Sequence, residues 1–291
     1  MTLGVMRPDP PIQSISDTAR WAAAFRALET RRPDALFSDP FAQRLAGQRG
    51  EDAIRVMPSG SRHAWAWTTR TFLFDQFIAA KIAQGVDAVV NLAAGLDARP
   101  YRMDLPKNLK WFEVDLPTLL DYKSEILRDD SPRCVLERVP LDLADAKARR
   151  EVLHRIHNAA RNVLVLTEGL LIYWTPEDVA ALARDLVGLS HFRSWITDLA
   201  SPGVLRMLQK NIGKPLNEAG APLRFGPAEG VAFFEPFGWR AAKVQSSIKT
   251  GARLKRLPFF LRLLALLPDS KGPPGNRPWS GVCLLERTRN A

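Results

Sequence analysis

The stretch Ala-Val-Val-Asn-Leu-Ala-Ala-Gly-Leu-Asp-Ala-Arg-Pro-Tyr-Arg, residues 88–102, runs from apolar side chains into small ones and then into an acid and an arginine. This order is typical of a buried parallel strand whose carboxyl end opens onto a ligand. Asp115 follows 20 residues after Gly95, at the end of a second predicted strand, Trp-Phe-Glu-Val-Asp. A carboxylate there can accept hydrogen bonds from two ribose hydroxyls. The pair indicates a nucleoside-containing cofactor, although the complete dinucleotide fingerprint is absent.

The chain outside this stretch alternates strand and helix patterns from residue 86 onward. Predicted strands lie at residues 87–93, 110–114, 134–139, 162–167, 192–198, 239–246 and 280–287. Helices are predicted between the early strands at residues 117–128, 143–158 and 176–188. This alternation favours an α/β fold with an open parallel sheet. Two further helices, at 16–31 and 67–83, precede the first strand and predict a helical cap over the first 84 residues.

Acidic residues follow each of the first four predicted strands: Asp97, Asp115, Asp142 and Glu168. The carboxyl ends of neighbouring parallel strands meet at one edge of the sheet, so these acids are expected to share a rim. Any one of them alone could simply cap the next helix. Four in succession favour a cationic or hydroxyl-rich ligand.

Composition limits the classes of protein to which the chain can belong. Its 291 residues are 46% hydrophobic, which suffices for one large α/β domain or two small ones. The net charge is +10, but the 41 basic residues are scattered and form no nucleic-acid-binding motif. Two distant cysteines fit a reducing compartment. Because neither a signal peptide nor an 18-residue apolar run is found, a cytoplasmic protein without a transmembrane segment is predicted.

Several ordered motifs make the chain recognisable as a whole. They are Arg26-Ala-Leu-Glu, residues 33–42, Arg70-Thr71, residues 91–102, residues 112–117, Leu141-Asp-Leu and residues 168–173. With them the chain resembles the leucine carboxyl methyltransferase and polyketide O-methyltransferase family, a branch of the class I S-adenosylmethionine-dependent methyltransferases. The resemblance implies a Rossmann-like fold with a mostly parallel seven-stranded sheet and one antiparallel strand at 279–287. It also implies a single domain, 1–291, divided into the cap (1–84), a cofactor-binding core (85–200), a lid insertion (201–236) and C-terminal strands (237–291).

The resemblance assigns three residues to the polar parts of S-adenosylmethionine. Arg70 matches an arginine that grips the carboxylate of the methionine moiety, a planar task that suits a guanidinium. Gly95 matches the turn where the backbone approaches the cofactor, and Asp115 matches the acid that holds the ribose. Where other members often have Gly-Ala, this chain has Ala93-Ala94, which adds a methyl group beside the cofactor.

Four further residues are assigned in the same way. Asp142 and Leu143 match the pair that recognises adenine, the acid through the exocyclic amine and the leucine by apolar contact. Glu168 matches an acid near the ammonium group of the cofactor, and Tyr173 is placed at the mouth of the substrate pocket.

The chemistry implied is an in-line methyl transfer, in which the enzyme aligns the acceptor with the methyl carbon. It requires no metal, and no metal site is predicted. A carboxylate acceptor is already ionised at neutral pH, whereas a phenol would benefit from a base. The four histidines, His63, His154, His157 and His191, lie outside the motifs. Because no histidine lies in a motif to act as a base, a carboxylate is favoured over a hydroxyl as the acceptor. The predicted function is therefore O-methylation of a carboxylate or hydroxyl of a small natural product, and a protein carboxyl terminus is a less favoured acceptor.

Other readings remain open from the sequence. A nicotinamide-dependent oxidoreductase could use Asp115 for its ribose, and a non-catalytic S-adenosylmethionine-binding protein would keep the same motifs. Residues 201–236 fit either a substrate lid or a helix packed on the sheet edge. The basic and apolar segment 253–267 fits a membrane surface, or more readily a packed connector or pocket wall. The oligomeric state is not predicted.

Overall fold

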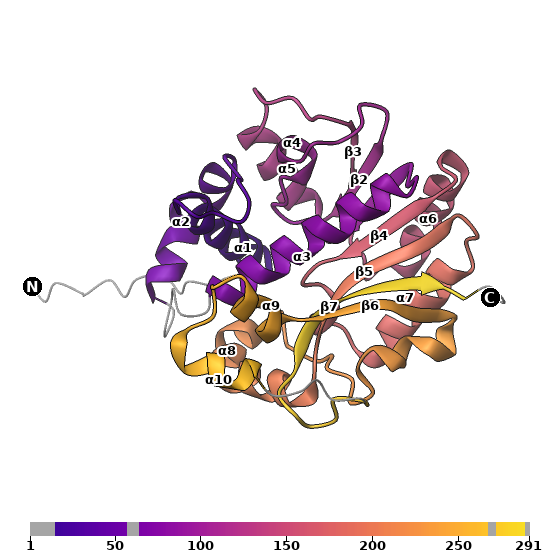
Figure 1. Ribbon diagram of the computed structural model, residues 1–291. Coiled ribbons are helices and arrows are strands. Elements are labelled where there is room, and N and C mark those ends of the chain that lie inside the picture. The colour runs from indigo at the N-terminus through magenta and orange to yellow at the C-terminus, as the bar shows by residue number, and fades with distance from the viewer. Residues whose placement is uncertain (1–14, 57–63, 267–271, 289–291) are drawn as a thin grey trace, which may run out of the picture.

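The computed structural model describes residues 15–56, 64–266 and 272–288. A seven-stranded sheet with the order β3-β2-β1-β4-β5-β7-β6 runs through its centre (Figure 1). Its strands are β1 Ala88–Leu92, β2 Lys110–Asp115, β3 Val135–Pro140, β4 Val163–Thr167, β5 Phe192–Ala200, β6 Trp239–Ser246 and β7 Ser280–Arg287. Strands β1 to β5 pair in parallel, whereas β7 runs antiparallel to β5 and β6. The expected α/β sheet, mostly parallel with one antiparallel strand, is confirmed.

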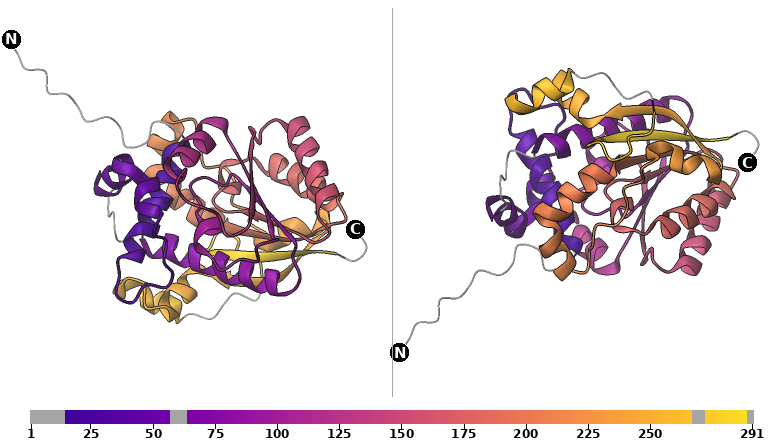
Figure 2. Two further views of the ribbon diagram at one scale, coloured as in Figure 1. Left: turned by 90° about the horizontal axis from the view of Figure 1, so that it is seen from above. Right: turned by 90° about the horizontal axis from the view of Figure 1, so that it is seen from below.

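The central strands β1 and β4 are buried along their whole length, which explains why they are nearly continuous apolar runs, whereas the outer strands β3 and β6 carry exposed polar residues. Successive side chains of a strand point to opposite faces. Val89 therefore packs with α3 (Ala64–Ala83), and Val90 packs with α6 (Ala146–Ala159) and α7 (Pro176–Val187). The views from above and below show these helices as layers on either side of the sheet (Figure 2).

Three helices precede the first strand, where two had been predicted. Helices α1 (Ile15–Thr30) and α3 correspond to the expected ones, but α2 (Ala42–Val56) is additional. Its buried residues Ala42, Leu45, Ala46 and Ala53 recur at helical spacing, although most of them are small. Moreover, Gly47 interrupts the helix with a φ of +59°. The periodicity of these residues indicates a helix that the sequence analysis missed, and packing against α1 stabilises it.

The remaining helices lie between strands or after β5. They are α4 Arg99–Arg102, α5 Pro117–Ile126, η2 Leu171–Tyr173, α8 Pro202–Glu218, η3 Gly230–Phe237, α9 Ser247–Arg253 and α10 Phe259–Ala265. Helix α6 begins three residues later than predicted, because the Asp145 side chain accepts hydrogen bonds from the backbone N–H groups of Lys147 and Ala148 and so caps it. Across the three described ranges, no helix is long and apolar enough to cross a membrane.

Candidate functional site

A cavity of about 1850 Å³ opens where β1, β2, β4 and β5 end, and helices α1, α3 and α8 complete its walls. This is the position where open parallel sheets bind ligands. All seven residues predicted for the site line this cavity: Arg70, Gly95, Asp115, Asp142, Leu143, Glu168 and Tyr173. The structure thus brings together residues that are up to 103 positions apart (Arg70 to Tyr173). The role of each one is still a prediction.

The turn after β1 is tightly constrained. Gly95 has a φ of +52°, and its backbone N–H donates to Oδ2 of Asp115 at 2.6 Å. A Cβ at this position would lie 3.3 Å from the Cβ of Ala19 in α1. Both the backbone conformation and the close approach of α1 therefore favour glycine. Ala93 also adopts a positive φ, +56°, a conformation disfavoured for any residue with a side chain.

Two carboxylates line the cavity beside this turn. Asp115 is buried, and its Oδ1 accepts the backbone N–H of Leu116 at 2.7 Å. Burial raises the pKa of Asp115, although the two backbone N–H donors oppose the rise. Oδ1 of Asp142 accepts the N–H of Ala144 at 2.9 Å. Because a carboxylate oxygen has two lone pairs, both acids keep the capacity to accept hydrogen bonds from a ligand.

Arg70 holds the opposite side of the cavity between two acids. Its Nε donates to Oε1 of Glu168 at 3.0 Å, and its Nη1 donates to Oδ2 of Asp198 at 3.3 Å. The guanidinium also lies 4.6 Å from the ring centroid of Trp67. Burial would lower the pKa of Arg70, but the charges of Asp198 and Glu168 outweigh it and raise the pKa. Arg70 is therefore a fixed cation.

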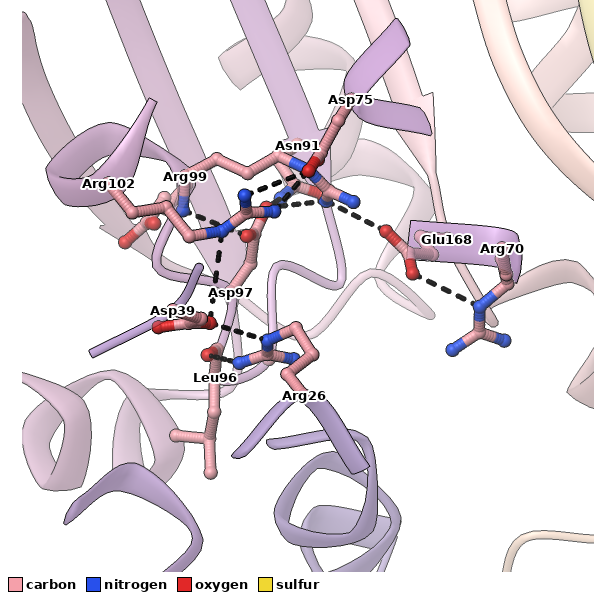
Figure 3. Close-up of polar contacts among 12 residues, drawn as sticks. Arg26, Asp39, Arg70, Asp75, Asn91, Leu96, Asp97, Arg99, Arg102 and Glu168 are labelled. Carbon is pink, nitrogen blue, oxygen red and sulfur yellow. Dashed lines mark hydrogen bonds and ion pairs between the residues drawn. The ribbon is translucent and has the colours of Figure 1, made fainter. Parts of the chain in front are cut away.

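Arg99 organises the polar network behind this pair (Figure 3). It is 2% exposed and donates to Asp75 at 2.6 Å, to Asp97 at 2.9 Å and to Glu168 at 2.7 Å. Asp97 also accepts from Nδ2 of Asn91 at 2.9 Å. Burial would raise the pKa of Asp97, but neighbouring cations, foremost Arg99, lower it to about 2.

This network corrects the expectation of a uniform acidic rim. Asp97 and Glu168 are engaged with arginines, whereas Asp115 and Asp142 accept only backbone N–H groups among the hydrogen bonds of the described residues. Arginines therefore neutralise Asp97 and Glu168, whereas no arginine or lysine side chain donates a hydrogen bond to Asp115 or Asp142 among the described residues. The sequence analysis did not assign Arg99, because its partners are 2, 24 and 69 residues away and no local pattern joins them.

Asp198 is a second residue that the sequence analysis missed. It lies in β5 near its carboxyl end, lines the cavity, and accepts the backbone N–H of Gly169 at 2.7 Å. Burial raises the pKa of Asp198, while Arg70 and the Gly169 N–H oppose the rise. The rule that identified the four rim acids, an acid at a strand's carboxyl end, would have found it had it been applied to the fifth strand.

The described histidines lie away from the cavity. His157 stacks on His191 with ring centroids 4.1 Å apart, and neither these two nor His154 lines the cavity. His63 lies outside the described residues. Within the described ranges, no group of three or more His, Cys, Asp or Glu side chains is arranged to hold a metal ion.

Much of the rest of the wall is apolar, although polar residues such as Asn211 and Glu229 also line it. Met207 and Ile212 of α8 line it, and α8 buries Leu205 and Leu216 in a cluster with Trp21 of α1. Helix α8 thus forms part of the wall, and its role as a lid is still a prediction. Leu261 of α10 also lines the cavity, so the segment 253–267 contributes to the pocket wall, which was one of the two predictions for it. Residue 267 itself lies outside the described residues.

Comparisons with known proteins show which proteins this chain resembles in sequence and fold. The sequence profile of the family described as leucine carboxyl methyltransferase matches residues 19–187, more than half of the chain. A "Putative S-adenosyl-L-methionine-dependent methyltransferase" of Parafrankia sp. (strain EAN1pec) is 33% identical over 250 residues, covering 80% of this chain and 79% of its own. A protein described in the same words, from Streptomyces coelicolor, is 32% identical over 272 residues, covering 89% and 92%. The crystal structure of a "putative methyltransferase" from Thermobifida fusca aligns with a TM-score of 0.59 at 15% identity, covering 96% of this chain and 97% of its own, and shows the shared fold.

Proposed function

Since this chain belongs to the leucine carboxyl methyltransferase family and is an S-adenosylmethionine-dependent methyltransferase, we propose that it transfers the methyl group to a carboxylate or hydroxyl oxygen of a small natural product. One observation carries the proposal. A single cavity holds the carboxylates of Asp115 and Asp142, the ion pair of Arg70 and Glu168, and a further apolar wall. The polar groups suit a nucleoside joined to an amino acid, and the apolar wall provides room for an acceptor.

The side chains present fit the cofactor. The carboxylates of Asp115 and Asp142 can accept hydrogen bonds from the hydroxyl and amine donors of a nucleoside. Arg70 beside Glu168 offers a cation and an anion to the two charged groups of an amino acid. We assign the ribose hydroxyls to Asp115 and the adenine to Asp142 and its neighbour Leu143.

The amino-acid end of the cofactor is assigned to the opposite pair. Arg70 would hold the carboxylate and Glu168 the ammonium group, since a guanidinium and a carboxylate side by side complement a zwitterion. Arg99 fixes Glu168 from behind and so sets the orientation of both groups. When bound, S-adenosylmethionine supplies an electrophilic methyl group on a sulfonium.

The residues on the acceptor side exclude water and orient the nucleophile. Trp65 and Met207 belong to the apolar wall that would hold the acceptor oxygen in line with the methyl carbon. A carboxylate is ionised at neutral pH and needs no base, so we favour a carboxylic acid. With a hydroxyl acceptor, Asp198 is the cavity carboxylate that would take the proton, because burial raises its pKa toward the range of a useful base.

Two measurements test the proposal. Calorimetric titration should show binding of S-adenosylmethionine and S-adenosylhomocysteine and none of NAD. Asp115→Ala should weaken the affinity for both by about tenfold or more, because charged hydrogen bonds are lost, whereas the exposed Asp121→Ala on α5 should leave it unchanged. Binding of NAD alone would support an oxidoreductase instead.

Transfer itself is followed with methyl-labelled S-adenosylmethionine and a panel of carboxylic acids and phenols. Methyl esters release volatile methanol in mild alkali, whereas aryl methyl ethers do not, so the treatment identifies the acceptor oxygen. Cofactor binding without transfer to any acceptor would support the non-catalytic alternative.

A further inference from the structure

Three large apolar side chains project from the surface around α10. Phe259 is 82% exposed, Leu263 is 72% exposed and Leu266 is 79% exposed. They occupy positions i, i+4 and i+7, which places them on one side of the helical segment. We call these three residues the apolar stripe. Figure 1 shows α10 at the periphery of the molecule, away from the centre of the sheet.

The segment around the apolar stripe is uniformly basic. Residues 247–266 contain five lysines and arginines and no acidic residue. Arg253, Lys255 and Arg262 are exposed around α10. Arg256 is different, because it pairs with Glu29 at 2.8 Å and thereby attaches the segment to α1. Exposed cations therefore lie on α10 itself and at the end of the adjoining α9.

The opposite side of the same segment is firmly packed. Leu257 is 2% exposed, and a Cβ on Gly251 would lie 3.1 Å from the Trp65 ring, so α9 lies close against α3. Leu261, between the residues of the apolar stripe in sequence, lines the cavity. The segment thus joins the cavity wall on one side to an apolar and basic surface on the other.

We propose that the apolar stripe docks onto a membrane surface that contains anionic lipids. The apolar side chains would enter the boundary between headgroups and acyl chains, while Arg253, Lys255 and Arg262 would meet the lipid phosphates. A protein partner fits less well, because stable interfaces involve about 20–30 residues a side and the apolar stripe has three. Docking in this way brings the cavity wall at Leu261 to the lipid surface, so an amphiphilic molecule can reach the cavity directly from the membrane.

Flotation of the full chain with vesicles tests this proposal. We expect binding to vesicles of phosphatidylcholine mixed with phosphatidylglycerol and much weaker binding to phosphatidylcholine alone. The double variant Phe259→Ser/Leu263→Ser should reduce binding to the mixed vesicles by about tenfold or more, because two apolar side chains no longer insert. Val135→Ser is the matched control, since Val135 is 55% exposed but lies in β3 at the other end of the strand order, and it should bind as the parent does.

Charge is tested separately with Arg253→Gln/Arg262→Gln, which should remove most of the preference for anionic vesicles. The proposal is overturned if neither vesicle binds, if neutral vesicles bind equally well, or if the Phe259/Leu263 variant binds like the parent protein. It is also overturned if sedimentation velocity shows a dimer that this variant abolishes, because a second copy would then cover the apolar stripe. Unchanged thermal unfolding of each variant shows that the fold persists.

Discussion

Replacing Ala93 by glycine should stabilise the protein. An alanine in the left-handed region costs about 1–2 kcal/mol, and the φ of +56° places Ala93 there. Glycine removes that strain, but it also gives the unfolded chain more freedom, which costs about 0.4–1 kcal/mol. The difference of these two values is about 0–1.6 kcal/mol, and the loss of the partly buried Ala93 methyl lowers it slightly, so we expect a net gain of about 0.5 kcal/mol in the free energy of unfolding, or a rise in Tm of about 1–2 °C in a chain of this size.

The neighbouring variant Ala94→Gly is the matched control and should have the opposite effect. Ala94 is 4% exposed and does not have a positive φ. Its loss removes a buried methyl worth about 0.8 kcal/mol and adds the entropy of glycine, a loss of about 1–2 kcal/mol in total. Urea unfolding of both variants should thus separate them by about 2 kcal/mol. Destabilisation by Ala93→Gly as well would refute the assignment of strain to this turn.

Three further substitutions test the network around the site. Gly169→Ala should lower the free energy of unfolding by about 1–2 kcal/mol, because the φ of Gly169 is +67°. It should also weaken S-adenosylmethionine binding, because the new Cβ would lie 3.1 Å from Nη1 of Arg70. Calorimetry on the folded variant measures the affinity. Asp97, whose pKa is lowered to about 2, contributes about 2 kcal/mol of stability that is present above about pH 4 and is lost as the pH falls toward 2. The stability difference between the parent and Asp97→Asn should therefore narrow over that range in urea titrations at several pH values, and a constant difference would contradict the electrostatic explanation. Lys123→Met should cost about 2–3 kcal/mol, because Lys123 and Glu113 form a fully buried pair at 2.6 Å and the variant leaves Glu113 with its longer ion pair to Arg138, at 3.1 Å. A loss below 1 kcal/mol would show that the Lys123–Glu113 pair contributes little.

The sheet could be predicted from the sequence because its strands carry their own signals. Apolar runs of five or six residues, such as Val163–Thr167, are buried on both faces and end at turn residues. Helix α2 was missed although its buried residues recur at helical spacing, because most of them are small and Gly47 interrupts the helix with a φ of +59°. Boundaries also moved wherever a capping side chain such as Asp145 decided the start of a helix. Elements whose signal lies in neighbouring residues could be predicted from the sequence, whereas elements that depend on packing against distant residues could not.

The part of the candidate site that lies at the ends of strands could be predicted from the sequence. Asp115 and Glu168 were found because each comes directly at or after a strand, and their meeting in one cavity follows from parallel pairing. The partners of these acids could not be predicted in the same way. Arg99 meets Asp75 from α3 and Glu168 after β4 only once the chain is folded, so no spacing in the sequence encodes the contact.

The net charge of the network around Arg70 and Arg99 affects how the site distinguishes S-adenosylmethionine from S-adenosylhomocysteine, the product of methyl transfer. Four carboxylates, those of Asp75, Asp97, Glu168 and Asp198, face three guanidiniums, those of Arg70, Arg99 and Arg102, so one negative charge is in excess. The longest of these hydrogen bonds joins Arg70 to Asp198, at 3.3 Å, which leaves Asp198 the least neutralised. An excess negative charge at low dielectric attracts a sulfonium and has no such attraction for the neutral thioether that remains after transfer. We therefore expect Asp198→Asn to lower the affinity for S-adenosylmethionine more than that for S-adenosylhomocysteine, since only the first carries the charge that Asp198 can attract. Equal losses of the two affinities would mean that Asp198 acts only through the position of Arg70.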